Sequence, residues 1–226
     1  MRQPAELAGP SIAVFDFDGT LTDRDMVGHF LCRTVGRRRF ALCVIRNIYP
    51  LLRAAVLGGP ARDVAKEKLI RTALTGRSSE WLSEHAESFA AHVVRSHLRD
   101  DTLALLREHQ QLQHHVIFLS ASLSCYLTPV GKFLGVDRVL ATELLEESGR
   151  ITGALAAPNV RGARKTVVLS SYLQQNMSAR SIMYSYGDST GDRYMLSVAD
   201  HPVWVKRVPI HRRTLRGLRG ILVDCR

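Results

Sequence analysis

The most constraining feature of this chain is an apolar run near its N-terminus that ends in two closely spaced acids. The run spans residues 12–15 and is followed directly by Asp16-Phe17-Asp18-Gly19-Thr20. A β-branched and aromatic run of this kind is typical of a buried strand, along which Asp16 and Asp18 would point to one side and Phe17 to the other. Such carboxylates can bind a divalent cation, or one can attack while the other transfers a proton. A polar strand end with an Asp-Gly turn has the same pattern, so the motif alone fits both interpretations.

Strands and helices are predicted to alternate along the second half of the chain. Apolar runs predict strands near 11–16, 115–119, 181–185 and 202–205, with shorter strands within 138–157. Helical patterns lie near 101–111, 122–135 and 163–175. Ser122 is expected to cap the second of these helices and Gly135 to end it. Strands separated by helices predict an α/β fold, namely a Rossmann-like parallel sheet with helices on both faces.

A long helical block interrupts this alternation after the first strand. Residues 25–98 have helical patterning, with breaks near Pro50, at 58–60 and at 75–78, where Ser78 can cap the next helix. A chain of 226 residues is long enough for a domain with an insertion. We therefore expect a core of residues 1–23 and 99–226 and an all-helical cap of residues 24–98, inserted above the sheet edge.

Further polar residues follow the second and third predicted strands. In open parallel sheets ligands bind outside the carboxyl ends of the strands, where Ser120 and Asp188 would lie. Ser120 and the amides of a helix start can bind a phosphate oxygen, although serine before a helix is usually only a cap. Lys165 begins a helix and could equally be a solvated lysine. Asp188 and Asp192 lie four apart after Gly187, as they also would in an acidic helix cap.

Taken together and in this order, these segments resemble the haloacid dehalogenase superfamily of phosphohydrolases. The matching residues are Asp16-x-Asp18-Gly19-Thr20, Ser120, Lys165 and Gly187-Asp188-Ser189-x-x-Asp192. The helical insertion after the first motif is similar to that of the phosphoserine-phosphatase-like branch, subfamily IB. The resemblance implies an enzyme, a phosphoric monoester hydrolase that works through an aspartyl-phosphate.

The resemblance also implies a role for each matching residue. Asp16 would be the nucleophile and Asp18 the general acid and base. Mg²⁺ would be held by Asp16, Asp188 and the backbone carbonyl of Asp18, with Asp192 orienting that shell. The phosphate would be bound by Ser120, Lys165 and Gly19.

Substrate identity is less constrained by the motifs. Asp25 occupies the place of an acidic residue that binds substrate in phosphoserine phosphatases, and Lys68 and Arg71 are candidates for the partner cation of the cap. We expect a small phosphorylated metabolite of the phosphoserine kind. The alternative is a phospholipid headgroup such as phosphatidylglycerophosphate, and a further alternative is a catalytically dead basic scaffold or nucleic-acid-binding protein. The intact site residues argue against the last, so no nucleic acid is expected.

Positive charge is concentrated in two segments of this chain, whose formal net charge is +10. Residues 26–60 contain six arginines and no acid, and residues 201–226 contain seven basic residues and one acid. These segments suit anionic partners, or they are solvated arginines without a partner. Arg39, Arg46 and Arg53 would form one stripe on an apolar helix if Pro50 does not break it. That helix could lie on an anionic membrane or be buried within the cap.

The expected compartment follows from cysteine usage and hydropathy. The four cysteines show no paired motif, which indicates free thiols in a reducing compartment. Residues 1–10 lack the apolar stretch of a secretory signal, and no run of about 18 apolar residues is present. We therefore expect a cytoplasmic protein, with contact to an anionic membrane as the alternative.

Overall fold

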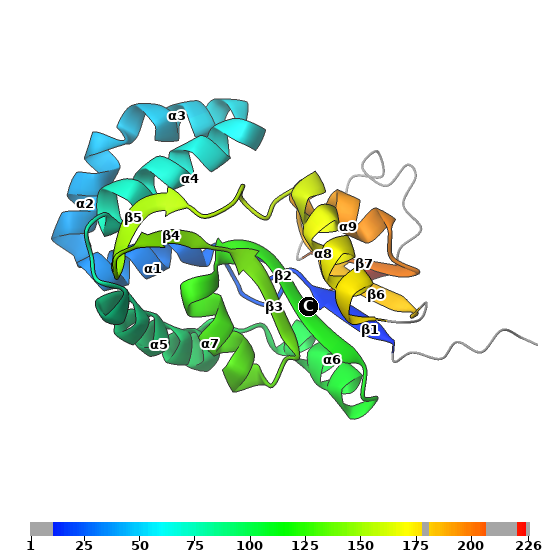
Figure 1. The fold of residues 1–226 in the computed structure, drawn as a ribbon. Coiled ribbons are helices and arrows are strands. Elements are labelled where there is room, and N and C mark those ends of the chain that lie inside the picture. The colour runs from blue at the N-terminus through cyan, green and yellow to red at the C-terminus, as the bar shows by residue number, and fades with distance from the viewer. Residues whose placement is uncertain (1–10, 178–180, 207–220, 225–226) are drawn as a thin grey trace, which may run out of the picture.

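A six-stranded parallel sheet forms the centre of the molecule (Figure 1). The computed structural model describes residues 11–177, 181–206 and 221–224. In spatial order the strands are β3 (Arg138–Thr142), β2 (His115–Leu123), β1 (Ile12–Phe15), β6 (Met183–Gly187), β7 (His201–Lys206) and β8 (Ile221–Asp224). The expected Rossmann-like α/β fold is confirmed. The edge strand β8 is not among the predicted strands, because its apolar run of three residues is shorter than a typical strand.

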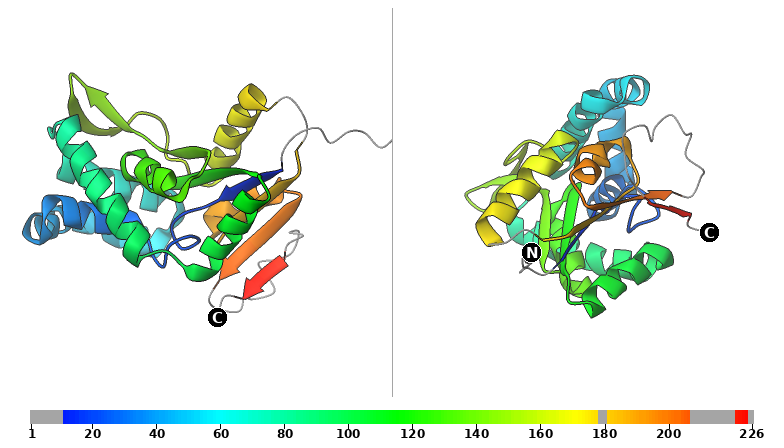
Figure 2. Two further views of the ribbon diagram at one scale, coloured as in Figure 1. Left: turned by 90° about the horizontal axis from the view of Figure 1, so that it is seen from below. Right: turned by 90° about the vertical axis from the view of Figure 1, so that its right-hand side faces the viewer.

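Helices cover both faces of this sheet, as the alternation along β1 requires. Phe15 points to the face covered by α6 (Asp100–Gln111) and α7 (Ser124–Leu134). Val14 points to the opposite face, which is covered by α8 (Ala163–Asn176) and α9 (Arg193–Ser197) (Figure 2). Side chains alternate along a strand, so a fully buried apolar run such as β1 supplies both cores.

Five helices between β1 and α6 form the cap beyond one end of the sheet (Figure 1). They are α1 (Met26–Val35), α2 (Arg37–Arg46), α3 (Ile48–Leu57), α4 (Gly59–Leu74) and α5 (Ser79–Ser96). The predicted cap at Ser78 is confirmed, because its Oγ accepts a hydrogen bond from the Trp81 N–H at 3.3 Å. The predicted break at 58–60 is also present, between α3 and α4.

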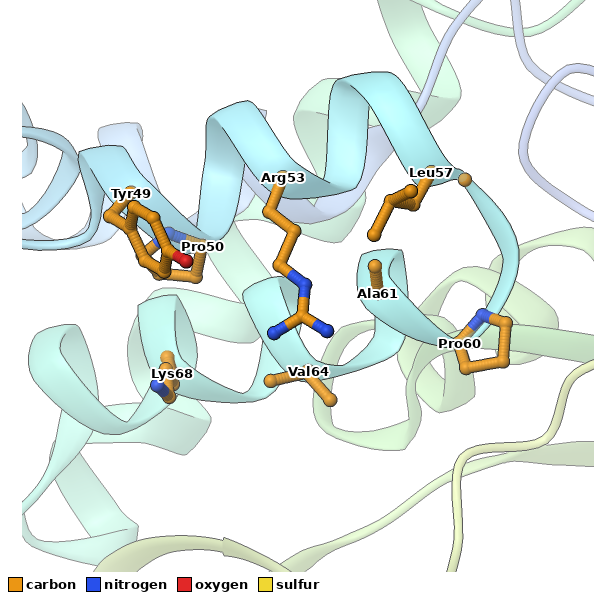
Figure 3. A pocket seen from close by; sticks show the side chains of 9 residues that line it. Tyr49, Pro50, Arg53, Leu57, Pro60, Ala61, Val64 and Lys68 are labelled. Carbon is orange, nitrogen blue, oxygen red and sulfur yellow. The ribbon is translucent and has the colours of Figure 1, made fainter.

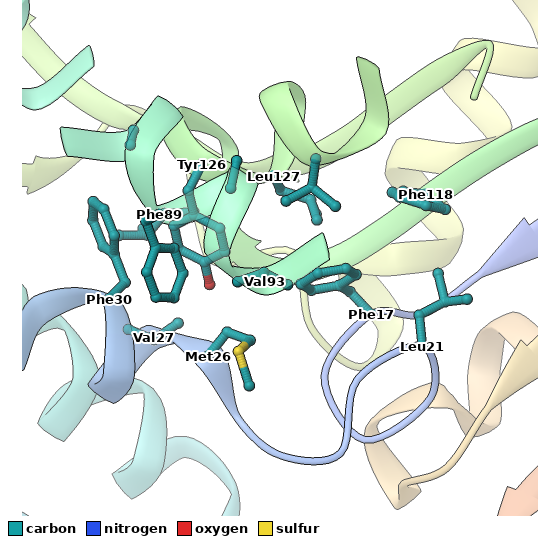
Figure 4. Packing of buried hydrophobic residues seen from close by; sticks show 14 of the residues in the cluster. Phe17, Leu21, Met26, Val27, Phe30, Phe89, Val93, Phe118, Tyr126 and Leu127 are labelled. Carbon is teal, nitrogen blue, oxygen red and sulfur yellow. The ribbon is translucent and has the colours of Figure 1, made fainter. Parts of the chain in front are cut away.

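The cap shares a hydrophobic core with α7 of the sheet layer (Figure 4). Tyr126 of α7 is fully buried, and its ring lies 4.9 Å from the ring of Phe30 in α1 and 5.2 Å from that of Phe89 in α5, measured between centroids. Aromatic rings at these separations stabilise each other beyond the burial of their area. Helices α1 and α5 are therefore packed directly onto the sheet layer.

The predicted break near Pro50 is present, but the helix bends at Asn47 and not at the proline itself. Helices α2 and α3 meet there at 71°. The buried Asn47 side chain donates to the Cys43 carbonyl at 2.8 Å and to Thr72 Oγ1 of α4 at 2.9 Å. Pro50 lies in the first turn of α3, where a helix needs no backbone donor and proline is tolerated.

This bend also changes the expected arginine stripe. Arg39 and Arg46 belong to α2, whereas Arg53 belongs to α3, so the three do not lie along one continuous helix. Within the described residues no helix by itself is long and apolar enough to cross a membrane, and the bent pair α2–α3 passes that test by length and composition. The second predicted basic segment, 201–226, lies largely outside the described residues.

The prediction that Ser122 caps the helix that follows β2 is wrong. Strand β2 runs on to Leu123, and α7 starts at Ser124 without a side-chain cap hydrogen bond. Gly135 does end α7 in the left-handed conformation, with φ 68°, as predicted. The short strands expected within 138–157 are β3 and the hairpin β4 (Leu144–Glu147) and β5 (Arg150–Leu155). The hairpin reaches the cap, where the Ile151 N–H donates to the Arg77 carbonyl at 2.9 Å.

Candidate active site

One cavity at the carboxyl edge of the sheet contains the eight residues that the sequence assigns to catalysis and to phosphate, metal and substrate binding. Strands β1, β2 and β6 are in register, with Phe15 paired to both Phe118 and Tyr186, so the residues that follow meet at one edge. The cavity has a volume of about 370 Å³. Its lining includes the eight predicted residues Asp16, Asp18, Gly19, Asp25, Ser120, Lys165, Asp188 and Asp192.

Asp16 is a buried acid of the cavity, with 6% of its surface exposed. Lys165 Nζ, also buried, lies 2.6 Å from Asp16 Oδ1 and 2.5 Å from Asp192 Oδ1. Burial, followed by the charge of Asp192, raises the pKa of Asp16 to about 8 against the opposing effect of Lys165. Burial alone would lower the pKa of Lys165, but the two carboxylates together raise it, so this lysine remains charged.

The acids around Asp16 form a suitable site for Mg²⁺. One carboxylate oxygen from each of Asp16, Asp188 and Asp192 lies within 4.8 Å of the others. Mg²⁺ prefers such hard oxygen donors, which in an octahedral shell lie about 3–4 Å apart. In their ionised forms, which a bound cation favours, the three carboxylates beside one lysine would have an excess of two negative charges, and a divalent cation would neutralise it. The donors and their charge therefore fit the expected cofactor.

Asp192 is held in place by the turn that precedes α9. Its Oδ2 accepts hydrogen bonds from the Ser189 N–H at 3.0 Å and from Ser189 Oγ at 2.7 Å, which forms a capping box. A Cβ at Gly187 would lie 2.6 Å from Asp192 Cβ, so only glycine allows this approach. The acidic-cap interpretation of this motif is thus also correct, and the cap orients Asp192 toward Lys165.

Asp18 is half-buried and faces the cap. Its Oδ2 accepts a hydrogen bond from Ser122 Oγ at 2.5 Å, and its Oδ1 accepts one from the Met26 N–H at 3.0 Å. Burial, and then the charge of Asp25, raises the pKa of Asp18 to about 7 although both hydrogen bonds oppose the rise. A carboxyl group with such a pKa can give and take a proton near neutral pH.

Ser120 and Gly19 complete the phosphate side of the cavity. Ser120 is buried, and its Oγ accepts a hydrogen bond from the Ser122 N–H at 3.1 Å, which leaves its hydroxyl proton available to an anion. Gly19 has φ 82°, and a Cβ there would collide with the Asp188 carboxylate. The Ser122 hydroxyl, which was expected to be a helix cap, instead links β2 to Asp18.

Asp25, the predicted substrate-binding acid, has a clear structural role. It is the N-cap of α1, and its Oδ1 accepts a hydrogen bond from the Val27 N–H at 2.9 Å. Its exposed side chain nevertheless lines the cavity. Its part in substrate binding stays a prediction.

The cap contributes cations that the sequence analysis missed. Lys68 and Arg71 line a different cavity, next to the β5 residues Gly153 and Ala154. Arg62 lines the active-site cavity instead. Lys66 Nζ donates to the Ala121 carbonyl, and burial lowers its pKa. The spacing of four residues that places Arg62 and Lys66 on one face of α4 is the sequence signal for this pair.

Polar contacts close the cap over the cavity. Asp63 of α4 accepts a hydrogen bond from Asn159 Nδ2 at 2.7 Å and forms an ion pair with Arg161 at 3.6 Å. Arg161 Nη1 also donates to the Gly59 carbonyl at 2.9 Å. The loop before α8 therefore binds α4 at the entrance of the cavity.

Comparisons with known proteins agree with this geometry. The protein CicA of Caulobacter vibrioides is 31% identical over 192 residues, which cover 84% of each chain. A protein of Bordetella pertussis Tohama I has a similar structure, with a TM-score of 0.78 and 23% identity over 94% of this chain and 99% of its own. A phosphoserine phosphatase, solved as an analogue of its phospho-aspartyl intermediate, has a TM-score of 0.62 at 14% identity, over 95% of this chain and 93% of its own.

The family is shown by a match over most of the chain. Residues 13–197, from β1 to the end of α9, match the family of haloacid dehalogenase-like hydrolases. This span includes all eight predicted site residues and the whole cap. The expected family is thereby confirmed, and with it the expectation of an enzyme: the chain belongs to the haloacid dehalogenase-like hydrolases.

Proposed function

We propose that this protein hydrolyses a phosphate monoester through an aspartyl-phosphate on Asp16, with Mg²⁺ as cofactor. The observation that carries the proposal is the position of Asp16, which bonds to the cation of Lys165 and groups with the carboxylates of Asp188 and Asp192 in the cavity. Asp18 is two residues away and has a pKa suited to proton transfer. Within this proposal residues 24–98 act as the cap and residues 1–23 and 99–226 as the core.

The reaction consists of two displacements at phosphorus. In the first, an Asp16 oxygen bonds to phosphorus, the bond to the ester oxygen breaks, and Asp18 gives its proton to that leaving oxygen. In the second, Asp18 takes a proton from water, which attacks phosphorus and releases Asp16 and inorganic phosphate. Lys165 and Ser120 bind the phosphoryl oxygens and stabilise their charge. Mg²⁺, held by Asp16, Asp188 and the Asp18 carbonyl, would neutralise the charge that otherwise repels the substrate.

A small phosphorylated metabolite is the substrate class that the cavity supports best. Its volume of about 370 Å³ is at the small end of ligand sites. Arg62 and Arg161 also line the cavity and add positive charge to that of Lys165. This charge suits a substrate with a carboxylate or another anion beside its phosphate.

Phosphate release across a panel of monoesters tests the proposal. With Mg²⁺ we expect turnover of small anionic esters such as phosphoserine, and no turnover after chelation by EDTA. The panel should include a phosphatidylglycerophosphate in mixed micelles, since preference for the lipid would favour the alternative substrate. If purified protein with Mg²⁺ hydrolyses no ester, the catalytically dead alternative becomes the better interpretation.

Replacing Lys66 by methionine is expected to weaken substrate use. Lys66 extends from α4 of the cap to the Ala121 carbonyl, and its charge acts on both Asp18 and Asp25. Hydrogen bonds that involve a charged group contribute about 1.5–3 kcal/mol, so kcat/KM should fall about tenfold to a hundredfold. Steady-state kinetics with a soluble ester measure this change. Lys68→Met, two residues away on α4 and outside the active-site cavity, is the matched control and should change kcat/KM less than twofold.

A membrane-bound substrate is the second candidate, favoured by an exposed apolar surface on the cap. We call this surface the cap arm, formed by α2, α3 and the start of α4. Its large apolar side chains that are at least half exposed are Leu42, Ile45, Ile48, Tyr49, Leu52, Val56 and Leu57. Arg53 lies among them, in a cavity lined by Tyr49 and Leu57 (Figure 3). Apolar side chains beside arginines suit an anionic lipid surface.

Acidic substitutions on the cap arm test this second candidate. In Leu52→Glu with Val56→Glu, the affinity for anionic liposomes, measured by sedimentation, should fall at least about thirtyfold, because burying each apolar side chain contributes about 1–2 kcal/mol. Hydrolysis of a soluble ester should not change, since neither residue lines the active-site cavity. Val167→Glu, at an exposed valine of α8, is the control for added charge. If the wild type ignores anionic liposomes at low salt, the membrane candidate is wrong.

A further inference from the structure

Three histidines from separate places in the chain meet at the base of the cap. His29 lies in α1, His92 in α5, and His97 directly after α5. One ring nitrogen of each lies within 4.8 Å of the others, and all three side chains are half-buried. The ring centroids are 4.8 Å apart for His29 and His97, 5.0 Å for His92 and His97, and 5.7 Å for His29 and His92. The group is compact, and it contains none of the residues assigned to catalysis above.

We propose that His29, His92 and His97 bind a transition-metal ion, with Zn²⁺ the best match, at a site separate from the carboxylates. Neutral imidazole is a common ligand of Zn²⁺, and three histidines are a known zinc ligand set. A tetrahedral Zn²⁺ with nitrogen ligands about 2.0–2.1 Å away holds those nitrogens about 3.4 Å apart. Side-chain rotations that move the ring nitrogens by about 1 Å would bring the three histidines to this separation. The carboxylate group around Asp16 has only oxygen donors, so the two sites should prefer different metals.

The electrostatic surroundings keep these imidazoles in the form that binds metal. Burial, followed by the charge of His97, lowers the pKa of His29, and burial together with Arg33 lowers the pKa of His92. Both rings are therefore neutral at pH 7 and have a free lone pair. Nearby Arg33 also opposes a bound cation, and the metal–nitrogen bonds must exceed that repulsion. Arg24 opposes it less, because it is paired with Asp23 at 2.6 Å.

Asp23 supplies the carboxylate that metal-binding histidines commonly have as a partner. Its Oδ1 lies 3.3 Å from His97 Nδ1. A proton on Nδ1, on the side of this carboxylate, would leave the lone pair of His97 on Nε2 for a metal. The Asp23 backbone N–H also donates to the His97 carbonyl at 3.1 Å. Asp23 therefore contacts both the side chain and the backbone of His97.

The position of the group indicates what a bound metal would do. The chain passes between core and cap twice, near Asp23 and near Leu98, and Thr22 and Leu98 form an antiparallel bridge there. A metal bound to the three histidines would link α1, α5 and this crossing. Asp23 in addition lines the active-site cavity, so a metal bound to the histidines would affect the catalytic site through this one side chain.

Calorimetric titration of the full-length protein with Zn²⁺, in excess Mg²⁺ to occupy the carboxylates, tests the proposal without any need for turnover. We expect one equivalent to bind and to raise the midpoint of thermal unfolding. His92→Gln and, separately, His29→Gln should each weaken binding at least tenfold. His85→Gln, also on α5 but outside the group, is the control and should bind as the wild type does. Co²⁺ in place of Zn²⁺ should give a visible absorption band that the His92 variant lacks.

Three results would overturn the proposal. The first is wild-type protein that binds no Zn²⁺ in the presence of Mg²⁺. The second is His92→Gln and His29→Gln binding as tightly as the His85 control. The third is a Co²⁺ band that both variants retain. Circular dichroism of the metal-free variants shows whether each is folded, and the use of two independent variants keeps the test valid if one of them is not.

Discussion

Asparagine at position 16 is expected to abolish phosphate release while the fold remains intact. An amide nitrogen or oxygen cannot form the aspartyl-phosphate, so the loss should be at least about 10⁴-fold, as for the removal of other catalytic nucleophiles. Asparagine has the same shape as the aspartate it replaces and still fits between Lys165 and the end of β1. Phosphate release, together with the mass of acid-quenched protein, measures both turnover and phosphorylation.

Two observations would contradict the assignment of Asp16. One is an Asp16→Asn variant that keeps more than a few per cent of wild-type turnover. The other is a phosphorylated protein mass in that variant after it is mixed with substrate. Unchanged circular dichroism is the control that separates lost chemistry from a lost fold.

Asparagine at position 18 should slow turnover by about 10² to 10⁴, the usual contribution of general acid and base catalysis. The loss should depend on the leaving group, because an ester whose oxygen needs no proton can still phosphorylate Asp16. With such an ester the aspartyl-phosphate should accumulate, since no group remains to activate water. The limb of the wild-type pH profile that reports the Asp18 carboxyl, whose pKa is about 7, should be absent in the variant.

Single-turnover kinetics with a good and a poor leaving group distinguish this prediction from a general defect. An equal loss for both esters would exclude Asp18 as the general acid. Asp25→Asn is a suitable control, because Asp25 also lines the cavity and asparagine keeps its capping hydrogen bond to Val27. That variant should raise KM without any dependence on the leaving group.

Local sequence patterns were sufficient to predict those residues of the candidate site whose positions depend on the end of one strand. Asp16 and Asp188 each follow a strand, Ser120 lies in the last part of β2, and the parallel register of β1, β2 and β6 brings them together. Ser122 was misplaced by the same reasoning, because β2 continues to Leu123 through a register irregularity that no local signal reveals. The strand therefore turns the Ser122 hydroxyl toward Asp18 and not toward the backbone of α7.

Features that depend on distant contacts were not predictable in this way. The bend between α2 and α3 was expected near Pro50, and its exact position at Asn47 depends on the side chain there, which bonds to Thr72 of a later helix. Lys66 acts on the site through Ala121, which is far away in sequence. Only the packing of α4 over the sheet edge selects Lys66 in preference to Lys68 or Arg71.

The contacts of the Tyr126 ring with Phe30 and Phe89 have a consequence for how this molecule unfolds and for which of its parts can be exchanged. Because the sheet layer and the base of the cap bury one continuous apolar interior, they should lose structure in a single cooperative transition. Residues 24–98 cut out alone would expose the faces of α1 and α5 that contact this tyrosine. A chimera that takes its cap from another family member would therefore have to bring α7 with it.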